Sequence, residues 1–482
     1  MSALPQPSVA LPLCVDCDGT LIKTDLLHES VLLLLKTQPW LLALLPVWLL
    51  RGKAHLKEQI AARVTLDAAT LPYDERVLER IRAARAAGRE TVLATASTLS
   101  QAQSVQAQLG LFDRIEATQN GVNLSGERKA ERLTALYGVR GFEYAGNDTA
   151  DLPVWRQSAG AIVVGASRSI VKAAARQAPV LETLTRARPT LALYVKAIRA
   201  HQWLKNLLVF VPLLAAHRVG DQAALLASAL AFLAFGLCAS AVYVVNDLFD
   251  LASDRQHVRK RRRPFASGAL PVAHGIALAP LLLLAAGLVC SLLPAAFSLT
   301  LALYFLLTSA YTFSLKNRVV VDVVVLALLY TSRLIAGSAA TGILPSFWLL
   351  AFSVFLFFSL AIVKRYAELL VALKAENDSL PGRGYRVTDM PVLLSLGVGC
   401  GNLAILVLAL YIHSPDIVGQ YPNRNVLWLG VPLALYWMSR VWMKTHRGEM
   451  HDDPVVFAAR DWQSWLVIAV VAALAAVAGR TW

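Results

Sequence analysis

The pattern of apolar and polar positions divides the chain near residue 190. Residues 1–185 mix charged and apolar residues, with apolar runs of strand length such as LPLCV and ETVLA, as a soluble α/β domain does. From residue 190 onward, apolar segments of bilayer length alternate with polar loops. The connector RQAPVLETLTRARPT marks the join. The pattern predicts an α/β domain over 1–185 and a membrane domain over 190–482.

Nine apolar segments in the second part approach the ~20 residues that a helix needs to cross a bilayer. They predict an all-α polytopic bundle of about nine transmembrane helices. The segments cover residues 203–217, 222–245, 273–292, 296–314, 319–340, 347–363, 391–412, 425–441 and 463–480.

The composition indicates a membrane protein, and this changes how the positive net charge is interpreted. Hydrophobic residues make up 56% of the chain and charged residues only 16%, against about 25% charged residues in soluble proteins. The net charge of +14 is concentrated in loops such as 246–272 and 364–390. Such loops face the cytoplasm in membrane proteins, so nucleic acid is not an expected partner. We expect a bacterial-type inner membrane with the N-terminal domain in the cytoplasm.

Two further features fit a cytoplasmic N-terminal domain. The N-terminus MSALPQPSVALPLC has no basic region before its apolar run, so it does not have the pattern of a signal peptide. The five cysteines are too few and too scattered for a disulfide framework.

The strand LPLCV ends in a pair of carboxylates, Asp16 and Asp18, followed by Gly19 and Thr20. Two carboxylates at this place suit phosphate transfer, because one can attack phosphorus while the other moves the proton of the leaving group. Alone, the pair is weak evidence, since a turn or a metal-binding loop can have the same spacing.

Three later stretches strengthen this interpretation. ETVLATAST supplies Thr95, whose hydroxyl can hold a phosphate oxygen, and GERKAERL supplies Lys129, which can neutralise it. EYAGNDTADLPV presents Asp148 and Asp151 for a divalent cation. The order of these motifs over about residues 10–185 resembles that of the haloacid dehalogenase phosphatases.

That resemblance implies a Rossmann-like α/β fold with a helical cap at about residues 28–90. It implies Asp16 as the nucleophile that forms an aspartyl-phosphate, and Asp18 as the general acid and base. It also implies Mg²⁺ held by Asp16, the carbonyl of Asp18 and Asp148. The alternative is a degenerate domain without catalysis.

The cap contains the apolar stretch VLLLLKTQPWLLALLPVWLLRGK, residues 31–53. Lys36 and two prolines argue against a membrane span. We expect the apolar face to lie in the membrane interface, with Trp40 and Trp48 near the headgroups, which would make the phosphatase substrate a lipid. The alternative is a cap packed on its own domain.

The stretch NDLFDLASDRQHVRKRRRPFASG follows the second apolar segment. If the helix continues into it, Asn246, Asp250 and Asp254 lie on one face, with Asp247 beside them. Oxygen ligands on one face suit a Mg²⁺-bound diphosphate. The basic run that follows could be a topology anchor alone, but that interpretation leaves the costly carboxylates at the membrane edge unexplained.

N-D-x-x-D-x-x-x-D after the second of nine helices resembles the UbiA prenyltransferase superfamily, over about residues 190–482. Its members bind a polyprenyl diphosphate through Mg²⁺ at two aspartate-rich motifs. Here the place of the second motif, the loop after the sixth segment, reads VKRYAELLVALK and offers Lys364, Arg365, Tyr366 and Glu368. Two Mg²⁺ ions on a prenyl diphosphate are therefore not expected.

Other stretches resemble the decaprenyl-phosphate phosphoribosyltransferase branch of the superfamily: IRAHQWLKNLLVFVPLL, YTFSLKNRVVVDVVVLALLYTSRLIAG, KRYAEL, RRRPFASG and HDDPVVFAARD. This resemblance implies transfer of 5-phosphoribosyl from phosphoribosyl diphosphate to polyprenyl phosphate. It implies that the Mg²⁺-diphosphate group lies at Asn246, Asp247, Asp250 and Asp254, with Asp250 central to catalysis.

Cations and polar groups near the predicted membrane edge are candidates for the remaining substrate contacts. Arg333 lies deep in an apolar segment, where a charge is functional by default, whereas a cation at a helix end is as often only snorkelling. Gln202 and Asn206 could orient the ribose, and Asp322 is a further polar candidate. The phosphate candidates are Lys205, Arg261, Lys316, Arg333, Lys364, Arg365 and Tyr366.

Together the two parts suggest consecutive steps, in which the N-terminal domain removes the 5-phosphate to give polyprenyl-phospho-ribose. One alternative is a prenyltransferase that moves a polyprenyl group from its diphosphate to an aromatic acceptor. Another is a lipid-binding transporter or scaffold with a regulatory phosphatase domain. A homo-oligomer is compatible with the sequence, which leaves the oligomeric state and the length of the prenyl chain open.

Overall fold

The computed structural model describes residues 11–380, 382–417, 420–450 and 453–479; the predictions for the first ten residues and for His451 and Asp452 of HDDP lie outside this part. The chain forms two compact units. One contains Met1–Ile198 and Tyr243–Ala279, and the other contains Arg199–Val242 and Pro280–Trp482. The aspartate-rich segment, residues 246–268, therefore belongs to the same unit as the N-terminal α/β region. The predicted domain boundary between residues 185 and 190 stays a prediction.

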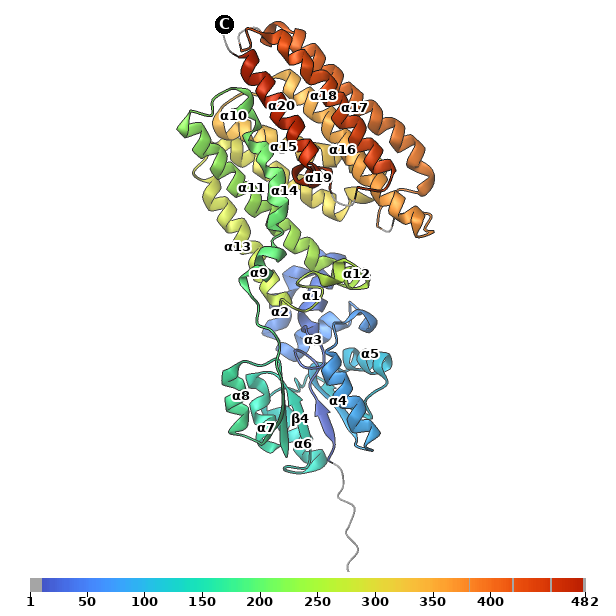
Figure 1. The fold of residues 1–482 in the computed structure, drawn as a ribbon. Coiled ribbons are helices and arrows are strands. Elements are labelled where there is room, and N and C mark those ends of the chain that lie inside the picture. Colours follow the sequence, from blue (N-terminus) through green and yellow to red (C-terminus); the bar gives the residue numbers. More distant parts are fainter. Residues whose placement is uncertain (1–10, 381, 418–419, 451–452, 480–482) are drawn as a thin grey trace, which may run out of the picture. The chain divides into compact units, whose positions relative to one another are not determined.

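The first unit contains a six-stranded sheet in the order β3-β2-β1-β4-β5-β6, with parallel neighbours throughout (Figure 1). Because β1 is central, residues directly after it lie where the strand order reverses, which is where open α/β sheets bind ligands. The predicted parallel α/β architecture is confirmed. The strands are β1 (Leu13–Val15), β2 (Thr91–Thr98), β3 (Arg114–Thr118), β4 (Glu143–Gly146), β5 (Gly160–Val164) and β6 (Val180–Leu184).

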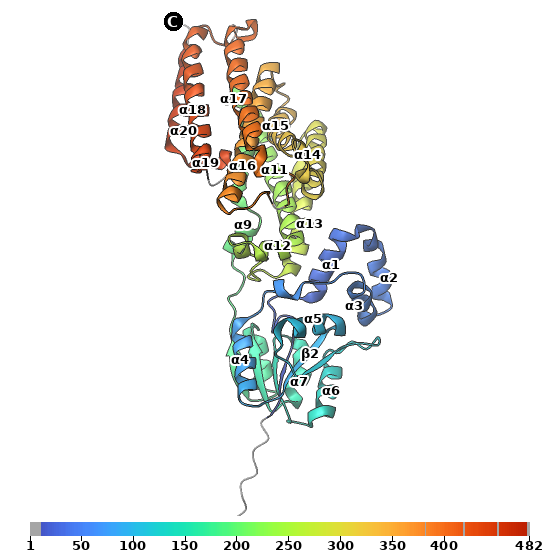
Figure 2. The same ribbon diagram turned by 90° about the vertical axis from the view of Figure 1, so that its right-hand side faces the viewer.

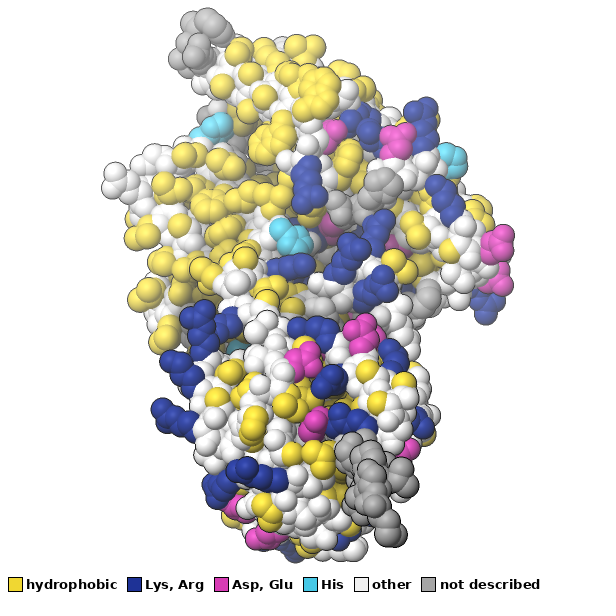
Figure 3. All heavy atoms as spheres, turned by 60° about the horizontal axis from the view of Figure 1, so that its bottom comes forward, with side chains coloured by type: hydrophobic (Ala, Val, Ile, Leu, Met, Phe, Trp, Pro, Cys, Tyr) yellow, Lys and Arg dark blue, Asp and Glu magenta, His cyan; other side chains and the backbone are white. Residues whose placement is uncertain are grey.

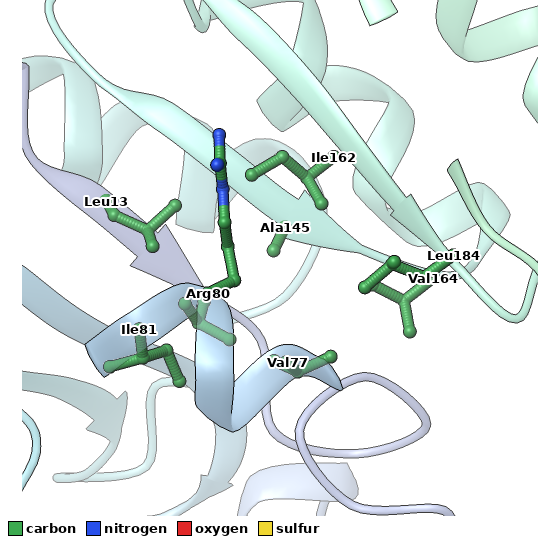
Figure 4. Close-up of a pocket in the computed structure, with 9 residues that line it drawn as sticks. Leu13, Val77, Arg80, Ile81, Ala145, Ile162, Val164 and Leu184 are labelled. Atoms are coloured by element: carbon green, nitrogen blue, oxygen red, sulfur yellow. The ribbon is translucent and has the colours of Figure 1, made fainter. Parts of the chain in front are cut away.

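Helices between the strands bury the sheet, so β1 and β5 are apolar and buried along their whole length. They are α4 (Glu75–Ala86), α5 (Leu99–Leu109), α6 (Glu127–Tyr137), α7 (Leu152–Gln157) and α8 (Arg168–Ala175). Figure 4 shows a small pocket between α4 and the sheet, lined by Leu13, Val77, Ile81 and other apolar side chains, with Arg80 alongside. These apolar side chains belong to the core, and the pocket offers no group for catalysis.

A group of helices, called the cap below, follows β1 in the stretch of about residues 28–90 where the resemblance implies a cap, and its role as a cap stays a prediction. It consists of α1 (Leu26–Thr37), the 3₁₀ helix η1 (Pro39–Leu44), α2 (Leu45–Leu50), α3 (Lys53–Ala61) and the 3₁₀ helix η2 (Ala68–Thr70). Helices α1, α2 and α3 lie side by side in Figures 1 and 2. The expectation for Trp48 is wrong, because its ring is 6% exposed in a small core with Leu34 and Ile60. Trp40 is 69% exposed and Leu50 is 89% exposed, as the interfacial interpretation requires.

The second part of the chain is a helical bundle with apolar side chains over wide areas of its surface (Figure 3). Within the described residues, seven helical segments are long and apolar enough to cross a membrane. They are Gln222–Phe249 (α11), Val272–Cys290 (α13), Ala295–Phe313 (α14), Val321–Thr341 (α15), Phe347–Lys374 (α16), Val387–His413 (containing α17, Met390–His413) and Arg424–His446 (containing α18, Gly430–His446). The pair α19 (Pro454–Arg460) and α20 (Trp462–Ala478), bent by 81°, is either one broken span, which would be the eighth, or a re-entrant loop.

The predicted number of nine is not confirmed, because residues 203–217 form no long α-helix. The 3₁₀ helix η4 (Ala200–Phe210) and the short α10 (Val211–Ala215) occupy this place. Pro212 at the start of α10 has no amide hydrogen for a continuous helix through this point.

The prediction of a loop from residue 364 is also wrong, since α16 continues to Lys374. The sequence KRYAELLVALK consists mostly of strong helix formers and contains no Gly or Pro. Lys364, Arg365 and Tyr366 therefore lie on a rigid helix, where their spacing is fixed.

One ionic cluster fastens the loop after β1 to the rest of the α/β region. Arg186, beyond β6, donates to the carbonyls of Gly19 (2.6 Å) and Thr20 (2.8 Å) and to the Asp74 carboxylate (2.9 Å). Arg76 also binds Asp74 through two nitrogens. Burial alone would raise the pKa of Asp74, but the hydrogen bonds from the two arginines outweigh it and hold that pKa well below its usual range.

Asp74→Asn should lower the free energy of unfolding by about 2 kcal/mol at pH 7, because it leaves the half-buried Arg186 with an unpaired charge. A carboxyl with a depressed pKa stabilises the fold above its unfolded pKa of about 4, and this contribution disappears at lower pH. The measurement is thermal unfolding of the full chain and the variant in detergent across pH. A difference that persists unchanged in acid would contradict the assignment.

Candidate active sites

The first candidate site lies at the carboxyl end of β1. Asp16 continues the strand, with its amide donating to the Ala145 carbonyl at 2.9 Å. Its carboxylate accepts a hydrogen bond of 2.7 Å from Lys129 on α6. Lys129 is 3% exposed and also donates to the Tyr144 hydroxyl at 2.9 Å. The fold thus brings together the two charged residues that the motif order predicts.

Asp18 lies two residues further along, on a loop that needs glycine. Gly19 has φ +73°, and a Cβ there would lie 2.2 Å from the Asn147 amide nitrogen. The Asp18 carboxylate accepts hydrogen bonds from the Ser97 hydroxyl (2.6 Å) and the Leu26 amide (2.8 Å). Both carboxylates of the pair are therefore held by fixed donors.

Burial determines the acidity of this pair. It raises the pKa of Asp16 to about 6, against the opposing charge of Lys129. It raises the pKa of Asp18 to about 7, and the negative charges of Asp25 and Asp16 add to this effect. A carboxyl that titrates near neutrality can both donate and accept a proton, as a general acid and base must.

The stretch ETVLATAST suggests a strand that ends at Thr95, but β2 continues to Thr98. The Thr95 hydroxyl is buried and accepts a hydrogen bond from the Ser97 amide at 3.0 Å. Ser97, which the sequence analysis missed, is the hydroxyl that contacts Asp18. In a strand, residues two positions apart such as Thr95 and Ser97 point to the same face, but the sequence did not show that the strand extends as far as Ser97.

The loop after β4 also differs from the expectation. Asp148 is exposed, and its carboxylate accepts a hydrogen bond of 2.6 Å from the next amide, that of Thr149. Asp151 is 3% exposed, lies 3.9 Å from Lys129 and accepts from the Tyr144 hydroxyl at 2.8 Å. Asn147 is the residue whose side chain contacts the Asp16 loop, accepting from the Thr20 hydroxyl at 3.2 Å.

The resemblance implies Asp16, the Asp18 carbonyl and Asp148 as the oxygen ligands of Mg²⁺, and the Asn147 side chain is a further oxygen donor on the loop after β4. Among the described residues, no group of three His, Cys, Asp or Glu is arranged to hold a metal. The amide oxygen of the Asn147 side chain would fit Mg²⁺ as a third ligand, because Mg²⁺ accepts neutral oxygen ligands. Asp148 stays a prediction as a ligand, and its side chain would have to turn away from Thr149.

The aspartate-rich segment, residues 246–268, keeps the helical spacing that the sequence predicts. Helix α11 ends at Phe249, and α12 (Leu251–Gln256) follows at once. The amide of Asp250 donates to the Asn246 carbonyl at 3.0 Å, and that of Asp254 donates to the Asp250 carbonyl at 2.8 Å. These bonds hold Asn246, Asp250 and Asp254 one helical turn apart.

Arg263 joins two carboxylates of this segment. One of its guanidinium nitrogens lies 3.0 Å from Asp247 and 2.5 Å from Asp254, both of which are 2% exposed. Arg261, the predicted phosphate contact, is exposed on the 3₁₀ helix η5 (Lys260–Arg262). Arg261 stays a prediction as a phosphate contact, and Arg263 is the arginine that pairs with the two carboxylates.

In the second unit, one carboxylate collects several cations. Asp453 lies 2.6 Å from the Lys205 ammonium and 3.6 Å from that of Lys364, and it accepts from the Tyr330 hydroxyl at 2.8 Å. Asp453 was not among the predicted site residues. The sequence does not indicate it because its partners lie far from it and from one another along the chain. Two lysines on one carboxylate leave a net positive group that can receive a phosphate.

A second carboxylate of this unit, Asp322, is fully buried with Arg365. Tyr311 and Arg383 also donate to it, at 2.8 Å and 3.2 Å. Arg365 pairs with Glu368 as well. Because its guanidinium is satisfied within the protein, the geometry favours a positioning role for Arg365 over the predicted phosphate contact.

Arg333 is 4% exposed and donates to the Asn206 side-chain oxygen at 2.9 Å and the Tyr304 hydroxyl at 3.3 Å. Asn206 is 1% exposed, and its amide nitrogen has no hydrogen-bond partner in the described structure. An unsatisfied buried donor is costly, so it favours a ligand acceptor at this place. This supports the role expected for Asn206.

The other predicted residues differ in their surroundings. Gln202, on η4, and Lys316, on the 3₁₀ helix η6 (Leu315–Asn317), are half-buried. Tyr366 is 4% exposed, and its hydroxyl lies 2.9 Å from the His446 ring nitrogen. His446, at the end of α18, is thus part of the packing around α16.

A model of the UbiA prenyltransferase family matches residues 207–465. An uncharacterized protein of Sinorhizobium fredii, y4nM, is 39% identical over 469 residues, covering 96% of this chain and 90% of that protein. A decaprenyl-phosphate phosphoribosyltransferase of Mycobacterium tuberculosis is 40% identical over 184 residues, covering 37% of this chain and 60% of that protein. This chain therefore spans less than two thirds of the transferase it matches.

Among solved structures, a UbiA homolog from Archaeoglobus fulgidus bound to DMAPP and Mg²⁺ aligns with 59% of this chain and 99% of that chain, at 18% identity and a TM-score of 0.46. The family assignment depends on the family model, which covers more than half of the 482 residues. The long apolar helices indicate in addition that the protein is an integral membrane protein. The chain belongs to the UbiA prenyltransferase family.

Proposed function

We propose that this chain transfers 5-phosphoribosyl from phosphoribosyl diphosphate to polyprenyl phosphate, and that its N-terminal domain then removes the 5-phosphate to give polyprenyl-phospho-ribose. The observation that carries the first step is the contrast between two places. Residues 246–254 offer carboxylates on successive helical turns, whereas the place expected for a second acidic motif offers the cation Lys364. One Mg²⁺-diphosphate site with additional cations suits a sugar diphosphate donor and an anionic lipid acceptor.

In the transfer step, an oxygen of the lipid phosphate forms a bond to C1 of the ribose while the bond from C1 to the diphosphate oxygen breaks. Asn246, Asp250 and Asp254 provide the oxygen face toward the leaving diphosphate, and Mg²⁺ bound there would neutralise its charge. Lys205 and Lys364 share Asp453 and retain positive charge for a phosphate. Asn206, with its free amide donor, is suited to a ribose hydroxyl or phosphate oxygen.

In the phosphatase step, the Asp16 carboxylate attacks the phosphorus of the 5-phosphate, and Asp18 protonates the departing ribose oxygen. Asp18 then takes a proton from the water that hydrolyses the aspartyl-phosphate. Lys129 holds Asp16 and can neutralise the phosphate oxygens. Burial would lower the pKa of Lys129, but the charges of Asp16 and Asp151 outweigh it, so the ammonium stays protonated.

The exposed apolar surface of the cap supports a lipid as the phosphatase substrate. It comprises Trp40, Leu42, Leu44, Val47, Leu49 and Leu50 on η1 and α2, each at least 40% exposed. Arg51 and Lys53 follow at its edge and are exposed. An apolar face with basic residues beside it is typical of an element lying in the membrane interface.

Asp16→Asn should stop the reaction at polyprenyl-phospho-5-phosphoribose, because the variant has no carboxylate to attack phosphorus. The phosphatase rate should fall at least ~10³-fold, while transfer stays near the wild-type rate. The assay incubates purified full chain in detergent with phosphoribosyl diphosphate, polyprenyl phosphate and Mg²⁺, and separates the lipid products. An unchanged product would refute the coupling of the two steps.

Asp250→Asn should reduce the transfer step at least ~10²-fold, because it removes a ligand of the diphosphate site. The same preparation should still dephosphorylate polyprenyl-phospho-5-phosphoribose that is supplied to it, which serves as the internal control. If the chain instead consumes polyprenyl diphosphate and prenylates an aromatic acceptor, the phosphoribosyl assignment is wrong.

A double variant of the apolar surface, Trp40→Ser with Leu50→Ser, should raise the KM of the phosphatase for the lipid substrate roughly tenfold or more. Each large apolar side chain contributes about 1.5–3 kcal/mol when buried, so losing two weakens contact with the bilayer. Hydrolysis of p-nitrophenyl phosphate, a soluble substrate, should not change. Equal effects on both substrates would show that the surface packs within the protein.

A further inference from the structure

Helix α1 of the cap begins at the phosphatase carboxylates. The amide of Leu26, its first residue, donates to Asp18 at 2.8 Å, and Asp25 caps the helix by accepting from the amides of Leu27 and His28. The negative charges at this end are favourable, since a helix N-terminus carries a partial positive charge. The position of α1 is thus fixed by the first candidate site.

The first turn of α1 contacts the aspartate-rich segment through a buried ion pair, which Glu29 makes with Arg255. The Glu29 carboxylate receives two hydrogen bonds from Arg255, at 2.6 Å and 2.9 Å. The two side chains are 6% and 8% exposed. The third guanidinium nitrogen donates to the carbonyl of Ala266 at 3.0 Å. Arg255 is therefore bound on both sides, between α1 and the end of the segment.

The C-terminal end of α1 reaches the same segment at Asp250. Lys36 donates to the Phe249 carbonyl at 2.7 Å and lies 3.3 Å from the Asp250 carboxylate. Phe249 is the last residue of α11, where carbonyls lack partners within the helix, so a cation there is favourable. The exposed Lys36 pair is the weaker of the two contacts.

Arg255 is adjacent in sequence to Asp254, and both lie on α12. A change in the position of Arg255 therefore displaces Asp254, and with it the ion pair that Arg263 makes with Asp254 and Asp247. A buried ion pair is poor evidence for stability, but it can specify one geometry, since removing either partner leaves a buried charge without compensation. The pair specifies the path of the segment that carries the candidate ligands.

We propose that Glu29, a residue of the phosphatase-like domain, is a positioning residue for the transferase site: through Arg255 it holds Asp250 and Asp254 in the geometry that binds the metal-diphosphate. The transferase then requires helix α1 whether or not the phosphatase acts. This inference depends on the proposed use of Asp250 and Asp254 in the transfer step.

The test compares Glu29→Gln and Arg255→Gln with a matched control, Glu127→Gln. Glu127 lies on the surface of the same domain and pairs with Arg156 at 3.7 Å, with both side chains exposed. We expect each of the first two variants to raise the Mg²⁺ concentration for half-maximal transfer at least ~10-fold, while phosphatase activity on the supplied phosphorylated lipid stays within ~2-fold. The control should leave both activities unchanged. The double variant Glu29→Arg with Arg255→Glu should recover part of the Mg²⁺ response.

A binding measurement makes the result independent of turnover. In an Asp16→Asn background, which removes a ligand of the phosphatase site, Mn²⁺ titration followed by electron paramagnetic resonance should show weaker binding when Glu29→Gln is added. Unchanged Mn²⁺ binding and unchanged Mg²⁺ dependence would overturn the proposal, as would a proportional loss of both activities with a lower Tm. Failure of the proposed function looks different: the wild type binds Mn²⁺ in a manner that depends on Glu29 but does not turn over phosphoribosyl diphosphate.

Discussion

The need to compensate buried negative charge shapes every candidate site in this chain. Asp16 is paired with Lys129, Asp254 with Arg263, Asp322 with Arg365 and Asp453 with Lys205. A carboxylate that is removed from water without a partner would cost several kcal/mol, or would take up a proton. Each pair therefore fixes a side chain from one element against a side chain from another, and the sites are held together by the same contacts that make them chemically useful.

Under the proposed function, the same pairs would let one chain bind phosphate groups at two places. A cation that neutralises a carboxylate is already oriented toward negative charge, so it can be shared with a phosphate oxygen when a substrate arrives. In the proposal, Lys129 would do this beside Asp16, and Lys205 with Lys364 would do it beside Asp453. Joining both activities in one chain would raise the local concentration of the intermediate for the second step.

Sequence patterns predicted the parts of the structure that depend on local order. The strand before Asp16 and the helical spacing of Asn246, Asp250 and Asp254 follow from short motifs and periodicity. The sequence did not indicate the contacts that arise only from folding. Ser97 reaches Asp18 because β2 continues past Thr95 to Thr98, and Arg263 pairs with Asp247 and Asp254 because the chain turns back after the basic run. The first predicted membrane segment failed for a third reason: hydropathy measures apolar character and does not distinguish a 3₁₀ segment with a proline from an α-helix.

The proposed function requires one chain to attach a phosphorylated pentose to a lipid phosphate and then to dephosphorylate it. The stoichiometry of a reaction with phosphoribosyl diphosphate labelled in the ribose and in the 5-phosphate tests both steps together. We expect one diphosphate and one orthophosphate to be released for each pentose that enters the lipid fraction, with the 5-phosphate label lost from the lipid. Retention of that label on the lipid, or the absence of any labelled pentose in the lipid fraction, would contradict the proposed function.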